Sequence, residues 1–300
     1  MGRLKFDFFS IQRHTLNMKI KFLAFPLIFL SLSVNADSYR LIKNEGDTLK
    51  ERINPPVDFE RTAVEKDSFA EYLRNYPLKS AESPVLLYDG QKKLNQDAHT
   101  AVFALPLQNN EFQNASGSII RLYAEFMRKA RLDQKISFHF TNGSVSKWTD
   151  WLEKSTVKRE TRLDFAGNLK KWTKYEKSAN EQELFDSYLK NVLANTDILS
   201  IQTYESEPVS FENLKIGDVL WDLGKPAHLC LVVDLCKNPE TGEKALLLAQ
   251  GNSPAQEFHV IKNPRHESNP WYYESDFILP LRTPEHLFPK DSWRHLKYLD

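Results

Sequence analysis

The chain has 300 residues, of which 41% are hydrophobic and 27% are charged, and this composition predicts a globular protein with one substantial core or two small ones. Forty basic and forty acidic side chains give a formal net charge of zero. A balanced charge argues against a nucleic-acid-binding protein, whose affinity would depend on neutralising phosphates. The composition also shows no collagenous, coiled-coil or disordered bias.

The N-terminal residues have the pattern of an export signal. Residues 18–36 begin with a short basic region, continue with an apolar run over 22–32, and end with the small-residue cleavage site Val34-Asn35-Ala36. The apolar run is shorter than the roughly 20 residues that span a bilayer. We therefore expect export to the periplasm or the medium, a mature chain over 37–300, and no stable membrane insertion after signal removal. Residues 1–17 precede Met18, which is a better translation start for a signal peptide, and they are interpreted as a wrongly assigned beginning.

The mature chain is predicted to be a single domain with a catalytic-type core at about 105–262. Near its start, Asp67 or Ser68 can cap a helix that continues through Phe69 and Leu73. Apolar runs at 85–88 and 101–107 predict two strands of an N-terminal hairpin. His99 falls in the loop between them and is interpreted as a surface histidine.

A long helix is predicted over residues 111–132, because apolar side chains recur there at three- and four-residue spacing. Its first turns carry Asn114-Ala115-Ser116. Free backbone N–H groups and the helix dipole favour a thiolate or an oxyanion at such a position. No cysteine occupies it.

Shorter elements follow in the next part of the chain. Their apolar patterns predict a strand at 136–140, a helix with Trp148 and Trp151 as core aromatics, a hairpin of 161–165 with 169–173, and a helix over 181–193. The C-terminal segment 263–300 is predicted to be an irregular tail whose aromatic side chains hold it against the core.

The stretch from Leu214 to Ile261 reads as an antiparallel meander, with apolar runs bounded by turn residues. His228 opens one strand and Gln250 closes the next, and the turn at 238–242 lies between them. In a hairpin these two positions lie at the same end of the ladder. An imidazole beside an amide oxygen could form the base and the orienting residue of a catalytic triad.

The two cysteines, Cys230 and Cys236, are interpreted as free. Six residues along one extended strand would separate them by about 20 Å, against a Cα limit near 7 Å for a disulfide, although a bulge or turn after Asp234 would shorten this distance. Cys230 shares a strand face with His228 and is interpreted first as a small buried hydrophobe. No HxH, HExxH or CxxC spacing occurs, so we expect no metal site and no cofactor.

Segments in order along nearly the whole mature chain resemble the exported bacterial family catalogued as domain of unknown function 4846. The segments that carry this resemblance are Ser68-Phe-Ala-Glu-Tyr-Leu-Arg74, Leu87-Tyr-Asp-Gly90, Ile120-Arg-Leu-Tyr-Ala-Glu125, Phe140-Thr-Asn-Gly143, Ile216-Gly-Asp-Val-Leu220, Ala227-His-Leu-Cys230, Leu248-Ala-Gln250, Pro254-Ala-Gln-Glu-Phe-His-Val-Ile261 and Asn269-Pro-Trp-Tyr272.

The layout is in turn similar to the NlpC-type branch of papain-like cysteine peptidases, whose members often cleave peptide bonds in bacterial cell walls. The resemblance implies an α+β fold with an antiparallel sheet packed against the long helix, an additional N-terminal hairpin and a C-terminal aromatic tail. It also implies that His228 is the base and Gln250 the orienting residue. The nucleophile position, a cysteine at a helix start, falls on Ala115.

Three functional hypotheses remain open. Loss of a nucleophile removes about a millionfold of rate, so the first is a degenerate hydrolase of the cell envelope that binds peptidoglycan or a peptide. The second is an active peptidase or amidase that uses Ser116 or Cys230 with His228. The third is a structural envelope protein in which His228 and Gln250 are satisfied core polar groups. A cleft at His228 and the start of the long helix would favour the first two, and burial of His228 without a cavity the third.

Overall fold

The computed structural model describes residues 39–107, 111–163, 169–175, 180–277, 280–290 and 292–300, with side chains described outside 155–179. The predicted signal peptide and the start at 1–17 lie outside these residues. Residues 40–300 form one compact unit. None of the described helices is long and apolar enough to cross a bilayer.

The helices of the described residues are α1 Leu49–Arg52, α2 Phe69–Arg74, α3 Ala115–Lys129, α4 Trp148–Thr156, α5 Glu181–Asn195 and α6 Ile198–Ser200. The described residues also form three two-stranded antiparallel sheets outside the main sheet: β3 Ser137–His139 with β4 Val145–Lys147, β5 Val157–Leu163 with β6 Leu169–Tyr175, and β13 Leu281–Arg282 with β14 Leu287–Phe288.

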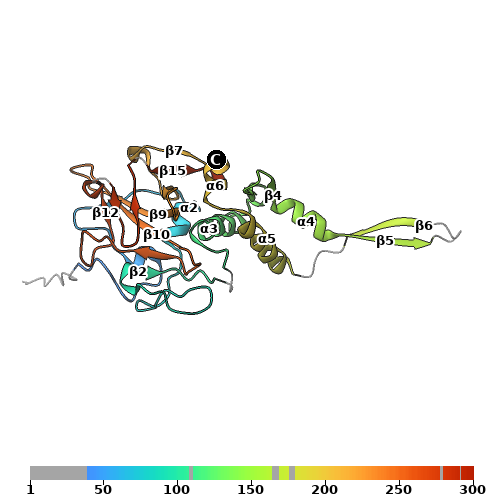
Figure 1. Ribbon diagram of the computed structural model, residues 1–300, viewed down its shortest axis with the longest axis horizontal. Helices are drawn as coiled ribbons and strands as arrows, with labels where there is room; N and C mark the ends of the chain where they lie inside the picture. Colours follow the sequence, from blue (N-terminus) through green and yellow to red (C-terminus); the bar gives the residue numbers. More distant parts are fainter. Residues whose placement is uncertain (1–38, 108–110, 164–168, 176–179, 278–279, 291) are drawn as a thin grey trace, which may run out of the picture. The chain divides into compact units, whose positions relative to one another are not determined.

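In the described part of the chain the main sheet has nine strands, and seven of them follow the spatial order β2-β11-β10-β9-β8-β15-β7. Its strands are β1 Glu60–Arg61, β2 His99–Val102, β7 Ser206–Pro208, β8 Val219–Asp222, β9 His228–Lys237, β10 Lys244–Gln250, β11 His259–Ile261, β12 Tyr272–Tyr273 and β15 Trp293–Leu296 (Figure 1). All of its pairings are antiparallel, β1 pairing with β9 and β12 with β10. The predicted α+β class and the central meander are confirmed.

The N-terminal hairpin prediction is wrong. β2 pairs with β11, which follows it in the chain by more than 150 residues, so that His259 faces Val102. Residues 85–88 make only isolated bridges, from Leu86 to Lys92 and from Leu87 to Gln256. His99 is also not a loop residue, because it begins β2 and its Nε2 lies 3.2 Å from the Ser83 carbonyl oxygen.

Helix starts are set by side-chain caps. The Ser68 hydroxyl accepts a hydrogen bond from the Glu71 N–H at 3.2 Å, as predicted for α2. The long helix α3 starts later than residue 111, because Asn114 is its N-cap and accepts from the Gly117 N–H at 3.1 Å. Ala115 is therefore the first residue of α3.

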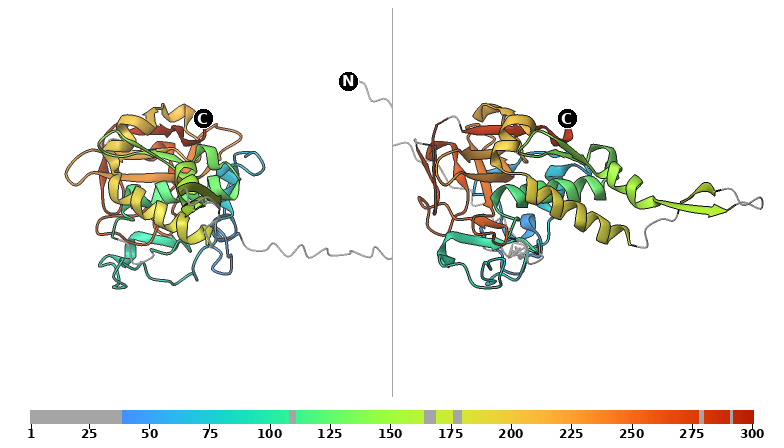
Figure 2. Two further views of the ribbon diagram at one scale, coloured as in Figure 1. Left: turned by 90° about the vertical axis from the view of Figure 1, so that its right-hand side faces the viewer. Right: turned by 45° about the vertical axis from the view of Figure 1, so that its right-hand side comes forward.

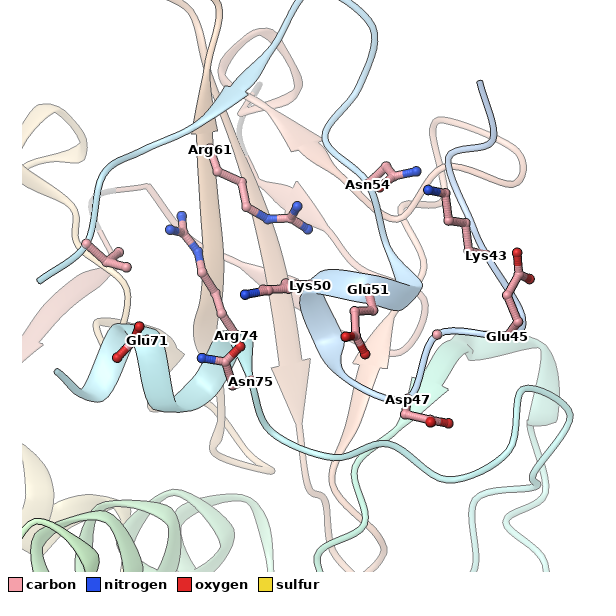
Figure 3. A pocket seen from close by; sticks show the side chains of 12 residues that line it. Lys43, Glu45, Asp47, Lys50, Glu51, Asn54, Arg61, Glu71, Arg74 and Asn75 are labelled. Atoms are coloured by element: carbon pink, nitrogen blue, oxygen red, sulfur yellow. The ribbon is translucent and has the colours of Figure 1, made fainter. Parts of the chain in front are cut away.

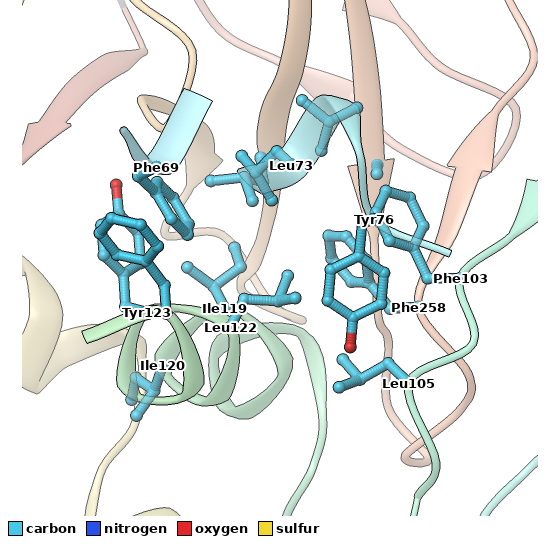
Figure 4. Close-up of a cluster of buried hydrophobic side chains, with 14 of the residues drawn as sticks. Phe69, Leu73, Tyr76, Phe103, Leu105, Ile119, Ile120, Leu122, Tyr123 and Phe258 are labelled. Atoms are coloured by element: carbon cyan, nitrogen blue, oxygen red, sulfur yellow. The ribbon is translucent and has the colours of Figure 1, made fainter. Parts of the chain in front are cut away.

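One face of the sheet packs against α2 and α3. Phe69 of α2 and Tyr123 of α3 meet with ring centroids 3.9 Å apart, next to Leu73 and Ile119 (Figure 4). The Tyr123 hydroxyl donates to the Gly217 carbonyl at 2.9 Å. Gly217 has φ +104, and a Cβ there would lie 2.8 Å from the Tyr123 hydroxyl, so only glycine fits.

The helix α5 packs against α3 and α4 (Figure 2). Trp148 at the start of α4 is fully buried, and its ring lies 5.1 Å from Phe185 and 5.5 Å from Tyr188 of α5. The prediction that Trp148 is a core aromatic is confirmed. The hairpin predicted over 161–173 is present as β5 and β6, with its turn outside the described residues.

The C-terminal segment covers the opposite face of the sheet. A second buried cluster there joins Cys230 and Val232 of β9 with Phe288 and Trp293. The segment is more regular than the predicted tail, because it supplies β12 to β15 and because Trp293 pairs with Leu220 inside the main sheet.

Candidate functional site

His228 and Gln250 lie side by side at one end of the β9–β10 ladder, as the position of the turn predicts. The His228 Nε2 is 2.7 Å from the Gln250 Oε1. Both side chains are buried, with 4% of His228 and 1% of Gln250 exposed. The sequence pairing of a strand-opening histidine with a strand-closing glutamine therefore corresponds to a direct contact.

Gln250 continues the contact into a chain of polar groups. Its Nε2 donates to the Glu285 carboxylate at 2.9 Å, and the same oxygen accepts from the Lys93 Nζ at 2.6 Å. Lys93 Nζ also lies 3.4 Å from the His259 Nε2, and the His259 Nδ1 lies 2.8 Å from the Glu257 carbonyl oxygen. Three further side chains from three distant segments, Lys93, His259 and Glu285, thus belong to the same network as the pair.

The direction of these hydrogen bonds determines the protonation of both imidazoles. The Gln250 amide nitrogen donates to Glu285, so its oxygen accepts, and the His228 Nε2 must carry the proton. The Glu257 carbonyl can only accept, so His259 carries its proton on Nδ1 and accepts from Lys93 on Nε2. In this arrangement His259 is neutral, and His228 has a proton on Nε2.

Burial supports the same assignment. Loss of solvent lowers the pKa of His228 to about 4, although the hydrogen bond that His228 donates to Gln250 acts in the opposite direction, and nearby His286 adds to the decrease. Loss of solvent also lowers the pKa of fully buried His259 to about 3, and the positive charge of Lys93 lowers it further. A general base works best with a pKa near the operating pH, so His228 is poorly matched to that task at neutral pH.

Cys230 lies on the same face of β9 as His228. Its Sγ is 3.9 Å from the His228 Nε2 and 3.5 Å from the Gln250 Oε1. Burial raises the pKa of the Cys230 thiol far above its ordinary value. Its nearest imidazole nitrogen is the one that already donates to Gln250, so nothing here converts the thiol into a thiolate. Cys230 and Cys236 are both free and belong to different buried clusters.

Ala115 and His228 face opposite sides of the sheet. Ala115 is buried in the cluster that joins α3 to Leu229 and Leu231 of β9. Side chains alternate along a strand, so His228 and Cys230 point away from that cluster. The sheet therefore separates the predicted nucleophile position from the predicted base.

Ser116 is likewise not a partner of His228 in the described structure. Its hydroxyl donates to the Asn114 Oδ1 at 2.9 Å, inside the cap of α3. The start of α3 lies close to Gly251, the residue that follows Gln250. A Cβ on Gly251 would lie 2.9 Å from the Asn114 carbonyl oxygen and 2.8 Å from the Ser118 hydroxyl.

A second histidine pair lies beside His228 and was not predicted. His286 Nε2 is 3.0 Å from the Asp222 Oδ2, and the His286 ring lies 5.1 Å from the His228 ring. His286 and Asp222 are partly exposed, with 16% and 24% of their side chains accessible. Within the described residues, no group of three or more His, Cys, Asp or Glu side chains has the geometry of a metal site.

Sequence reasoning missed Lys93, Glu285 and His259. His259 carried a usable signal, because it interrupts the apolar run Phe258 to Ile261 on a strand. Lys93 and Glu285 lie in irregular segments and carry no periodic pattern, so only the three-dimensional structure brings them to the site.

The chain matches the family described as domain of unknown function 4846 over residues 49–295. It belongs to this family. The match extends from the start of α1 into β15 and includes Lys93, His228, Gln250, His259 and Glu285. No curated protein and no solved structure matches the chain significantly. The family description names no activity, so the function must be argued from the site.

Proposed function

We propose that this member of the domain of unknown function 4846 family is an exported protein of the cell envelope that acts by binding peptidoglycan or a peptide and does not hydrolyse it. The proposal includes a distant relation to the NlpC-type, papain-like fold. Support for that relation is the arrangement of a long helix before a meander in which a strand-opening His228 contacts Gln250. Support for export is the N-terminal pattern of residues 18–36.

One observation carries the non-catalytic part of the proposal. His228 is a buried neutral imidazole whose Nε2 donates to Gln250, and no activated nucleophile contacts it among the described residues. The peptidase alternative with Ser116 is disfavoured, because that hydroxyl donates to the cap of α3. The alternative with Cys230 is disfavoured by the raised pKa of its buried thiol. In the His228 network the imidazole has the role of a satisfied core group. The ligand of the proposed function therefore binds at another part of the protein.

The activity test compares the mature protein with Ala115→Cys and with His228→Ala on purified cell-wall fragments and generic peptides. We expect no turnover from any of the three. A thiol at residue 115 would lie across the sheet from His228, so a cysteine introduced there should not create a hydrolase. His266→Ala, which removes a more exposed histidine, controls for the loss of an imidazole as such.

Turnover by the unaltered protein that disappears in His228→Ala would overturn the proposal, and so would turnover gained by Ala115→Cys. The binding part is tested by co-sedimentation with insoluble peptidoglycan, where we expect the protein in the pellet. Failure to co-sediment, together with no affinity for soluble peptides, would leave a structural envelope protein. N-terminal sequencing of the exported protein should begin at Asp37.

A further inference from the structure

A charged pocket of about 860 Å³ lies away from His228, between α1, β1 and α2 (Figure 3). Its lining residues are Lys43, Glu45, Gly46, Asp47, Lys50, Glu51, Asn54, Arg61, Val64, Glu71, Arg74 and Asn75. Eight of these twelve are charged, which distinguishes the pocket from the mainly apolar hollows that bind drug-like ligands.

The floor of the pocket holds two guanidinium groups on a single buried carboxylate. Asp234 is 0% exposed, and its two oxygens lie 2.7 Å from the Arg61 Nε and 2.7 Å from the Arg74 Nε. The Leu235 N–H also donates to Asp234, at 2.8 Å. Two positive charges against one negative charge leave one formal positive charge in the floor, and an unbalanced charge in a desolvated position attracts an anion strongly.

The two arginines differ in how many donors they have left. Arg74 uses all three nitrogens, because its Nη1 donates to the Thr62 carbonyl and its Nη2 to the Thr62 hydroxyl and the Leu235 carbonyl. Arg61 uses Nε for Asp234 and Nη2 for the Ile53 carbonyl. Within the described residues its Nη1 has no acceptor, and 20% of its side chain remains exposed.

The rim adds both signs of charge. Lys50 of α1 is exposed and lines the same pocket as Arg61 and Arg74 (Figure 3). Glu51 and Glu71 each accept a backbone N–H at the start of a short helix, from Thr48 and Asp67 respectively. Glu45 and Asp47 are exposed on the loop before α1. A cationic floor with an acidic rim matches a ligand that has a carboxylate and an ammonium group.

We propose that this pocket binds a short peptide through its free carboxylate, with Arg61 Nη1 as the principal donor, and that the acidic rim receives the peptide's ammonium group. An arginine with an unused donor can add a charge-assisted hydrogen bond to a carboxylate. The inference rests on the proposed binding function and names the site and the ligand class for it.

Isothermal titration calorimetry on the mature protein tests the proposal with alanyl-alanine, its C-terminal amide, its N-acetyl form and inorganic phosphate. We expect the free dipeptide to bind at least about tenfold more tightly than the amide, because the amide lacks the negative charge. The N-acetyl form should also bind more weakly. Equal affinity for the amide or for the N-acetyl form would overturn the proposal, as would affinity for phosphate equal to that for the dipeptide.

Arg61→Gln should weaken dipeptide binding by about tenfold or more. The variant should still fold, because Asp234 keeps its ion pair with Arg74. Lys50→Gln changes an exposed residue of the rim, so it is a second test of the pocket with less risk to folding. It should weaken dipeptide binding by a smaller factor than Arg61→Gln does. Lys66→Gln, an exposed lysine outside the pocket lining, is the matched control and should bind as the parent does. Unchanged affinity in both Arg61→Gln and Lys50→Gln would overturn the assignment of the pocket.

The two proposals fail in different ways. Turnover of cell-wall fragments would remove the non-catalytic function whatever the pocket binds. Binding to peptidoglycan without turnover, but insensitive to Arg61→Gln and Lys50→Gln, would overturn the pocket assignment and leave the proposed function in place.

Discussion

Protonation of His228 should destabilise the folded protein in mild acid. The imidazole is buried and neutral, and burial lowers its pKa from 6.5 to about 4. Between these two values the unfolded chain binds a proton that the folded chain does not, so the free energy of unfolding falls as the pH falls. The contribution is fully present above the unfolded pKa and is lost as the pH drops to the folded value.

The size of the effect follows from the pKa difference. Lowering the pH from about 7 to about 4.5 should remove about 2.5 kcal/mol of stability through His228 alone. Other groups also titrate in this range, so the informative quantity is the difference between the parent and His228→Gln. The glutamine has no charge at either pH and should lose about 2.5 kcal/mol less than the parent does.

Urea unfolding followed by tryptophan fluorescence measures the free energies at the two pH values. Cys230→Ala is the matched control, because it removes packing on the same face of β9 and leaves His228 in place. It should lower the stability at both pH values and keep the parent's pH dependence. If His228→Gln and the parent lose the same unfolding free energy between the two pH values, the claim that His228 is buried and neutral is refuted.

Two further substitutions test the contacts that hold the fold. Asp234→Asn should cost about 3 to 5 kcal/mol of unfolding free energy, because Arg61 and Arg74 both lose their carboxylate; a loss below about 1 kcal/mol in urea unfolding would contradict a structural role for this pair. Ser68→Ala should cost about 1 kcal/mol, because the Glu71 N–H loses its acceptor at the start of α2; thermal unfolding measures this change, and an unaltered midpoint would show that the cap contributes nothing.

Local patterns were enough to predict the central ladder and the contact between His228 and Gln250. Both residues are polar interruptions at the ends of apolar runs, and the intervening turn determines which ends of the strands meet. The Ser68 cap of α2 and the buried Trp148 could be predicted in the same way, because capping and helical spacing are local properties.

Which face of the ladder receives α3 could not be predicted from the sequence. β9 is buried on both faces from His228 to Cys236, so alternation separates its side chains into two sets but does not say which set faces the helix. The assignment of Ala115 to the same site as His228 depended on that choice. The structure shows the two residues on opposite faces of the sheet.

Long-range pairings were also beyond prediction. Arg61 and Arg74 reach Asp234 across 173 and 160 residues of sequence, and neither arginine differs in its local pattern from a surface residue. A bulge in β9 near Val233 contributes to the contact between Asp234 and the two arginines. Leu247 of β10 pairs with Asp234 and Leu248 pairs with Val232, so Val233 is the extra residue of β9. A bulge has no simple composition signal in a continuous apolar run.

The position of β15 determines the order in which the sheet can be completed. β15 lies between β8 and β7, and in the described part of the chain β7 pairs with no other strand. Before Trp293 has left the ribosome, a nascent chain can form the hairpins of β8, β9 and β10. The outer edge of β8 then remains unpaired. Such an edge can pair with another chain. Folding should therefore finish late, and a truncation before Trp293 should favour aggregation over a smaller stable domain.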